Sequence, residues 1–191
     1  MQTDIRVYAC SLSAHISGSN ISYKEKNYRM EKKTLILGVG NLLLKDEGVG
    51  IHVIRALEKE TLPAHVTLMD GGTGGLHLIS WLTGYDHIIM VDATLDTHPP
   101  GTVRLIRPKY ASDYPPLMSA HEIGLRDMIE TMILTGDLPE VHLIVVSATN
   151  LNEVNMELTP EVEASIPEVI KVIRELIKKY SCAQIDNHTG Q

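Results

Sequence analysis

Apolar residues from position 34 onward follow two alternating spacings. Continuous apolar runs of five to seven residues predict buried strands at 34–39, 66–70, 87–92, 102–106 and 141–147. Between these runs, apolar residues recur at intervals of three and four, which is the spacing of a helix that buries one face. Strands interleaved with helices predict an α/β protein whose mainly parallel sheet is covered on both faces.

Four helical segments follow from the second spacing. The last, at 159–180, contains Pro167, which predicts either a kink or a restart of the helix through a capping box at Ser165 to Glu168. The apolar positions of the four are Val49, Val53, Ile54 and Leu57; Leu76, Ile79 and Leu82; Leu125, Ile129, Met132 and Ile133; and Val162, Ile166, Val169, Ile170, Ile173 and Ile177.

The strand at 102–106 is expected to run antiparallel to its neighbours. Only residues 93–101 separate it from the preceding strand, and they include Pro99-Pro100-Gly101. A crossover between parallel strands needs a dozen or more residues. The connection lengths therefore predict a five-stranded, mostly parallel sheet with one antiparallel strand.

Composition narrows the class of protein. The 191 residues are 43% hydrophobic with a formal net charge of -7, which suits one globular domain and excludes a disordered chain. The acidic balance argues against nucleic acid or an anionic membrane as a partner, and no apolar run approaches the 18 residues of a membrane span. The two cysteines, Cys10 and Cys182, form no disulfide framework, so we expect a reducing, cytoplasmic location.

The first 29 residues differ from the rest. They show no sustained apolar periodicity, so we interpret 1–29 as a loose N-terminal segment, 30–180 as the domain and 181–191 as a C-terminal tail. Our hypothesis is that Met30 is the functional start, and a Ser-rich transit peptide remains the alternative. Without 1–29, the remaining 13 basic and 22 acidic residues give a net charge of -9.

The segment after the first strand begins like a dinucleotide fingerprint, Gly38-x-Gly40, but Leu43 stands where the third glycine is needed. Two carboxylates follow, Asp46 and Glu47, which would repel a pyrophosphate. We expect Asp46 to cap the following helix. For Glu47, a capping role and a ligand role remain equally open.

Three further candidates follow later strands. The glycine-rich loop Gly71 to Gly75 favours contact with a substrate over a purely structural turn. Asp92 ends a strand, where ligands bind in parallel sheets, although a loop cap is equally consistent with this position. Ser119 and Glu122 match a capping box, which places His121 in the first turn of a helix as a neutral imidazole able to bind a metal, or as an incidental residue.

Four motifs within residues 33–180 resemble, in order and spacing, those of the hydrogenase maturation endopeptidases. They are Gly38-x-Gly40-Asn41-x-Leu43-x-x-Asp46-x-Gly48-x-Gly50, Asp70-Gly71-Gly72-Thr73, Asp92-Ala93 and Ser119-x-His121-x-x-Gly124-Leu125. The resemblance implies a three-layer α/β/α sandwich with a five-stranded sheet. It also implies removal of a C-terminal extension from the precursor of the nickel-iron hydrogenase large subunit after nickel insertion.

The same resemblance implies roles for individual residues. Glu47, Asp92 and His121 match the family's metal-contacting residues, with nickel delivered by the substrate and other divalent ions able to substitute. Asp92 is our first choice for the catalytic group. Substrate contacts are expected from Asn41, Gly71, Gly72 and Thr73.

Two alternatives remain open at this point. One is a non-enzymatic nickel-checkpoint or chaperone protein that binds the precursor without cutting it. The other is a different hydrolase of similar fold, such as a peptidyl-tRNA hydrolase, whose first loop also begins Gly-x-Gly-Asn. The net charge of -9 opposes the second, because a tRNA channel needs basic residues.

Overall fold

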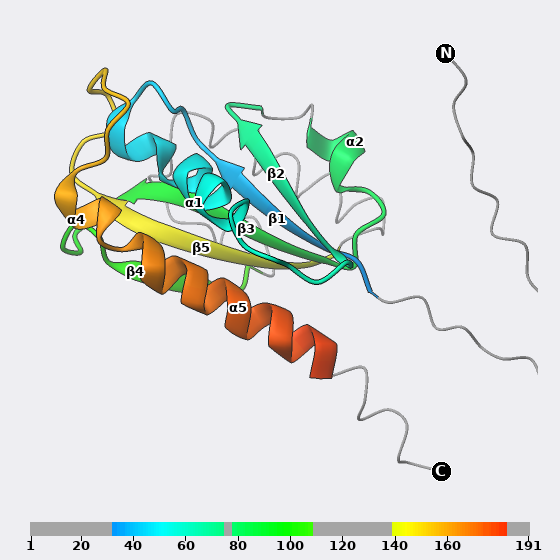
Figure 1. Cartoon of the computed structure of the whole chain (residues 1–191). Coiled ribbons are helices and arrows are strands. Elements are labelled where there is room, and N and C mark those ends of the chain that lie inside the picture. The colour runs from blue at the N-terminus through cyan, green and yellow to red at the C-terminus, as the bar shows by residue number, and fades with distance from the viewer. Residues whose placement is uncertain (1–31, 75–77, 109–138, 183–191) are drawn as a thin grey trace, which may run out of the picture. The chain divides into compact units, whose positions relative to one another are not determined.

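The computed structural model describes residues 32–74, 78–108 and 139–182. Within these ranges five strands form one sheet in the order β2-β1-β3-β5-β4 (Figure 1). All neighbouring pairs are parallel except β4 and β5, which run antiparallel. The strands are β1 (Thr34–Val39), β2 (Val66–Gly72), β3 (His87–Leu95), β4 (Val103–Ile106) and β5 (Glu140–Ala148).

The described helices are short except at the C-terminal end. Helices α1 and α5 lie together across one face of the sheet, and α2 lies apart from them near β2 (Figure 1). None of the helices in the described residues is long and apolar enough to cross a membrane. Their bounds are η1 (Lys45–Gly48), α1 (Val49–Leu57), α2 (Ile79–Leu82), α4 (Pro160–Glu163) and α5 (Ile166–Cys182).

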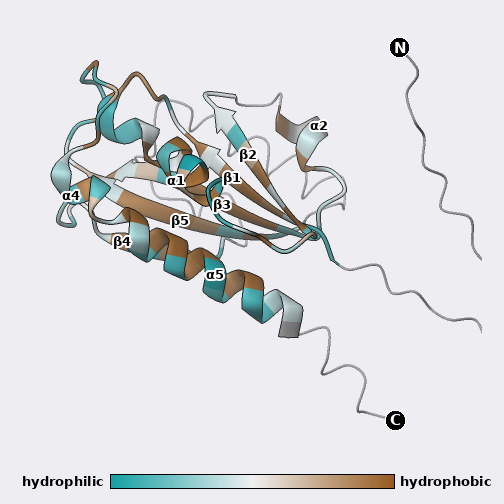
Figure 2. Cartoon of the chain, viewed as in Figure 1, coloured by the Kyte–Doolittle hydropathy of each residue, from teal (hydrophilic) through white to brown (hydrophobic). Residues whose placement is uncertain are grey.

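The side chains of the central strands alternate between two apolar clusters, as a period of two requires. Ile36 and Ile89 lie in the cluster that contains the buried faces of α1 and α5. Leu35 and Leu37 point to the opposite cluster, which includes Leu82 from α2. Helices on both faces confirm the predicted sandwich. Figure 2 shows that the strands are largely apolar, whereas polar and apolar residues alternate along α5.

The strand and helix predictions hold with altered ends. The bounds of β1 are as predicted, whereas β2, β3 and β5 each extend beyond the predicted runs because backbone pairing with a neighbouring strand continues past the apolar residues. The antiparallel strand is confirmed, but it pairs with β5 and not with the strand that precedes it in sequence. The stripe from Leu125 to Ile133 lies outside the described residues.

The C-terminal helix restarts and does not merely kink. Helix α4 ends at Glu163 and α5 begins at Ile166, so Pro167 occupies the first turn of a new helix, where its missing N–H costs nothing. The predicted capping box is wrong in its chemistry. The Ser165 hydroxyl donates to the carbonyl of Val162 at 2.6 Å, while the Ser165 carbonyl accepts from Glu168 N–H.

Candidate active site

The end of β1 packs unusually closely against the start of α1. A Cβ atom on Gly50 would lie 2.4 Å from the carbonyl oxygens of both Val39 and Val91, and one on Gly38 would lie 2.3 Å from the Gly50 oxygen. Backbone this close admits only glycine. Gly38 and Gly50 therefore bring the start of α1 against the end of β1 and the middle of β3.

A third glycine, Gly40, holds Glu47 at this junction. Gly40 has a φ of +133°, and a Cβ atom there would lie 1.8 Å from the Glu47 carbonyl oxygen. The loop 40–48 is thus folded back onto the end of β1, and η1 contacts β3. The Glu47 side chain is fully buried. A carboxylate is rarely buried to this degree unless it is paired or binds a cation.

Asp46 does not cap its own helix, contrary to the sequence prediction. No side-chain capping bond occurs at the start of η1 or α1. Instead, Asp46 accepts two hydrogen bonds from Thr159, the residue immediately before α4, through the backbone N–H at 2.7 Å and the hydroxyl at 3.0 Å. The η1 turn directs this fully buried side chain toward Thr159, away from the start of α1.

Asp92 lies at the topological switch point of the sheet. From β1 the chain leads through α1 to β2 on one side, while β3 flanks β1 on the other. Asp92 does not end its strand, contrary to the sequence prediction, because β3 continues to Leu95 in pairing with β5. The β1 pairing with β3 ends at Val91, and Asp92 is the next residue. Its side chain is 2% exposed, and Oδ1 accepts a hydrogen bond from Ala93 N–H at 2.8 Å. Ligands bind at this position in open parallel sheets.

The residues predicted to contact substrate lie near this end of the sheet. Gly71 and Gly72 belong to β2, and Gly72 accepts a backbone hydrogen bond from Gly40 N–H at 2.9 Å. Thr73 is exposed. The Asn41 Oδ1 accepts from Leu43 N–H at 3.0 Å, so this side chain also shapes its own loop. Gly75 lies outside the described residues, and the contacts with substrate remain a prediction.

The predicted metal set is described only in part. The structure brings η1, with Glu47, against β3, with Asp92. His121 lies outside the described residues. Within the described ranges, no set of three His, Cys, Asp or Glu side chains is placed to hold a metal ion. The metal role of these residues therefore remains a prediction.

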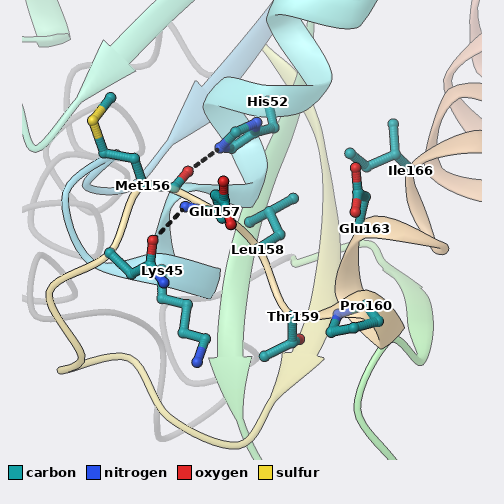
Figure 3. Close-up of a pocket in the computed structure, with 10 residues that line it drawn as sticks. Lys45, His52, Met156, Glu157, Leu158, Thr159, Pro160, Glu163 and Ile166 are labelled. Carbon is teal, nitrogen blue, oxygen red and sulfur yellow. Dashed lines mark hydrogen bonds between the residues drawn. The ribbon is translucent and has the colours of Figure 1, made fainter.

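A cavity that the sequence did not indicate opens beside the Glu47 loop. It has a volume of about 630 Å³, and its lining combines Lys45 and His52 with the segment after β5 (Figure 3). His52 Nε2 lies 3.2 Å from the Met156 carbonyl oxygen. The segment carries no recognisable motif. The cavity also depends on contacts between residues more than 100 positions apart, which local sequence patterns do not reveal. The other lining residues are Asn155, Glu157, Leu158, Thr159, Pro160, Glu163 and Ile166.

A polar cluster at the opposite end of the sheet was also missed. Tyr180 stacks on His87, with ring centroids 3.7 Å apart, and its hydroxyl lies 2.5 Å from His142 Nδ1. Arg107 Nε donates to His142 Nε2 at 2.6 Å and pairs with Glu140. Burial, followed by the nearby Arg107 charge, lowers the pKa of His142 to about 4, and burial raises the pKa of Tyr180. This end carries the N-terminal ends of β3 and β5, away from the site.

The fold and this site define an α/β enzyme whose candidate chemistry rests on buried carboxylates at the switch point of its sheet. A family model described as hydrogenase maturation protease matches residues 51–176. The hydrogenase 2 maturation protease of Escherichia coli K12 is 33% identical over 153 residues, covering 77% of this chain and 92% of that protein. The chain belongs to the hydrogenase maturation protease family, and hence to the hydrolases.

Solved structures agree with this assignment. The hydrogenase maturating endopeptidase HybD from Escherichia coli matches with a TM-score of 0.72 and 34% identity, covering 77% of this chain and 93% of that chain. The NiFe hydrogenase maturation protease HybD from Thermococcus kodakarensis matches with a TM-score of 0.64 and 29% identity, covering 75% of this chain and 98% of that chain. The predicted fold class is thereby confirmed.

Proposed function

We propose that this protein is the endopeptidase that removes the C-terminal extension of a nickel-iron hydrogenase large-subunit precursor after nickel has been inserted. The observation that carries the proposal is the burial of two carboxylates, Glu47 and Asp92, on adjoining elements at the switch point of the sheet. Membership of a maturation protease family supports the same reaction.

Nickel enters this scheme as part of the substrate. Glu47, Asp92 and His121 supply two carboxylates and one imidazole, a donor set suited to a borderline divalent ion such as nickel, and other divalent ions would substitute. Ligation by these residues positions the precursor's metal beside the bond to be cut. Cleavage then follows only when the metal has been delivered.

Water is the nucleophile in the proposed reaction. Its oxygen bonds to the scissile carbonyl carbon, and its proton passes to the Asp92 carboxylate and then to the departing amide nitrogen as the C–N bond breaks. Ligation to the substrate's nickel is the alternative source of activation, since a bound divalent ion lowers the pKa of water. We place the reaction in the cytoplasm, in line with the near-absence of cysteine.

The backbone at the end of β2 is suited to hold the extended tail. Gly72 has a φ of +50°, and its N–H donates to Asp70 Oδ1 at 2.9 Å, so the strand turns sharply where Thr73 becomes exposed. Glycines without side chains let another chain approach closely. Asn41, Gly71, Gly72 and Thr73 are therefore proposed to contact the precursor tail.

The direct test incubates the purified protein with nickel-loaded and nickel-free precursor and measures the precursor mass. The proposal expects loss of the C-terminal extension from the nickel-loaded form alone. Binding of the precursor without mass loss would instead establish the non-enzymatic checkpoint protein. Equal cleavage of both forms would remove nickel from the recognition scheme.

A further inference from the structure

Large apolar side chains gather on one exposed surface beside the candidate site. Five large apolar residues are exposed within the described ranges, and three of them belong to two segments that lie side by side: Leu43 at 57%, Val154 at 82% and Met156 at 53%. Single exposed apolar residues are ordinary, but neighbouring ones mark an interaction surface. We call these three side chains the apolar rim.

Backbone bonds fix the two segments of the apolar rim together. Leu44 and Asn155 form an isolated parallel bridge. Asn155 N–H donates to the Leu43 oxygen at 3.0 Å, and Lys45 N–H donates to the Asn155 oxygen at 2.6 Å. The three apolar residues flank this bridge. Their exposure is therefore a property of a braced structure, and collapse onto the body of the protein would break those bonds.

The apolar rim is continuous with the candidate site. Leu43 is on the same loop as the buried Glu47, and the other segment leads to Thr159, which Asp46 holds by two hydrogen bonds. Figure 3 shows the Met156 side chain directed away from Thr159 and Pro160. Lys45 pairs with Glu153 at 2.7 Å, so these two charges next to the rim neutralise each other. Glu157, which directly follows Met156, is exposed, so the surface combines apolar contact with an acidic group at its edge.

Size argues against a permanent dimer through this surface. A stable interface buries roughly 800 Å² on each partner. Three partly exposed side chains supply only a minor share of that area. A small interface binds weakly, and weak binding suits a protease because it must release its product after cleavage.

We propose that the apolar rim docks the folded body of the hydrogenase large-subunit precursor while the C-terminal tail enters the site. This proposal rests on the proposed function. A tail that reaches Glu47 and Asp92 leaves the folded body to which it is attached at the loops around them, and the apolar rim is on those loops. The precursor must present an apolar patch close to the base of its tail.

The test compares the kinetics of cleavage of nickel-loaded precursor by the wild type and by the triple variant Leu43→Ser, Val154→Ser and Met156→Ser. The proposal expects KM to rise at least about tenfold with kcat retained, because docking energy is lost while the chemistry is untouched. The control is Leu105→Ser, which removes an apolar side chain of similar exposure, 45%, from β4. It is expected to leave KM unchanged.

Each remaining outcome has a defined meaning. An unchanged KM in the triple variant overturns the docking proposal and leaves the proposed function intact. A wild type that neither binds nor cuts the precursor overturns both. A wild-type dimer that the triple variant converts to a monomer, measured by light scattering, assigns the apolar rim to a second copy of this chain and also overturns the proposal.

Discussion

The Asp46 carboxylate holds Thr159 by two hydrogen bonds across a sequence separation of 113 residues. One oxygen accepts from the Thr159 backbone N–H and the other from its hydroxyl. Because Asp46 precedes Glu47 and Thr159 precedes α4, this pair ties the loop of the candidate site to the start of the C-terminal helices.

Removing the Asp46 carboxylate should therefore loosen two elements together. We expect Asp46→Ala to lower the free energy of unfolding by about 1 to 3 kcal/mol, since the half-buried N–H of Thr159 would be left without its acceptor. Thr159→Val removes only the hydroxyl bond and should cost about 1 kcal/mol. Urea denaturation measures both.

The pair is tested further by a double-mutant cycle. If Asp46 and Thr159 act as one unit, the double variant will lose less stability than the sum of the single variants. Strict additivity would show that the hydrogen bond from the Thr159 hydroxyl to Asp46 contributes nothing to stability.

The junction of β1, β3 and α1 should not tolerate a single added methyl group. We expect Gly50→Ala to lower the free energy of unfolding by about 3 kcal/mol or more, because the backbone oxygens of Val39 and Val91 cannot retreat without breaking the sheet. Thermal or urea unfolding of the purified variant provides the measurement.

The matched control is Gly84→Ala. Gly84 has a φ of +94°, and a Cβ atom there has open space around it. We expect Gly84→Ala to lower the free energy of unfolding through conformational strain alone, by about 1 to 2 kcal/mol. Equal destabilisation at Gly50 and Gly84 would contradict the packing argument.

The polar cluster around His142 should make stability depend on pH. Because Arg107 Nε donates to His142 Nε2, the neutral ring carries its proton on Nδ1 and donates it to the Tyr180 hydroxyl. Its folded pKa of about 4 lies below the ordinary value of 6.5, so the unfolded chain binds the proton more readily. The stability that neutral His142 contributes to the folded state is fully present above pH 6.5 and is lost as the pH falls toward 4.

Urea denaturation at pH 7 and pH 5 tests this dependence. The wild type should be less stable at pH 5, and His142→Gln should show a smaller decrease because it cannot take up the proton. Between pH 7 and pH 8.5 the histidine is neutral in both states, so neither protein should change on its account. A variant that keeps the whole wild-type decrease between pH 7 and 5 would exclude His142 as the source.

Local patterns were sufficient to predict the strands but not the pairs that build the site. The runs around Ile36 and Ile89 predicted buried strands because a continuous apolar run is itself the local signal of burial. The partnership of Asp46 with Thr159 depends on where two distant segments meet, and no local spacing encodes it. The same holds for the stacking of Tyr180 on His87, which joins the last helix to the start of β3.

The residues of the candidate site differ in how far the sequence alone could assign them. Glu47 and Asp92 were candidates because they are carboxylates that follow apolar runs, and the resemblance to a known family selected them over capping roles. The structure shows both side chains buried. The spacing of Gly38, Gly40 and Gly50 was visible in the sequence, but the reason for Gly50, its close backbone contact with β1 and β3, required the fold. The role of His121 stays a prediction.

The central claim is that Glu47 and Asp92 are required for removal of the precursor's C-terminal extension. The most direct measurement is mass spectrometry of nickel-loaded precursor incubated with the wild type, Glu47→Gln, Asp92→Asn and His121→Ala, using Glu175→Gln on the exposed face of α5 as control. We predict complete processing by the wild type and the control, and at least a hundredfold loss of rate in the three site variants, each still folded by circular dichroism. Full processing by folded Asp92→Asn would contradict the account.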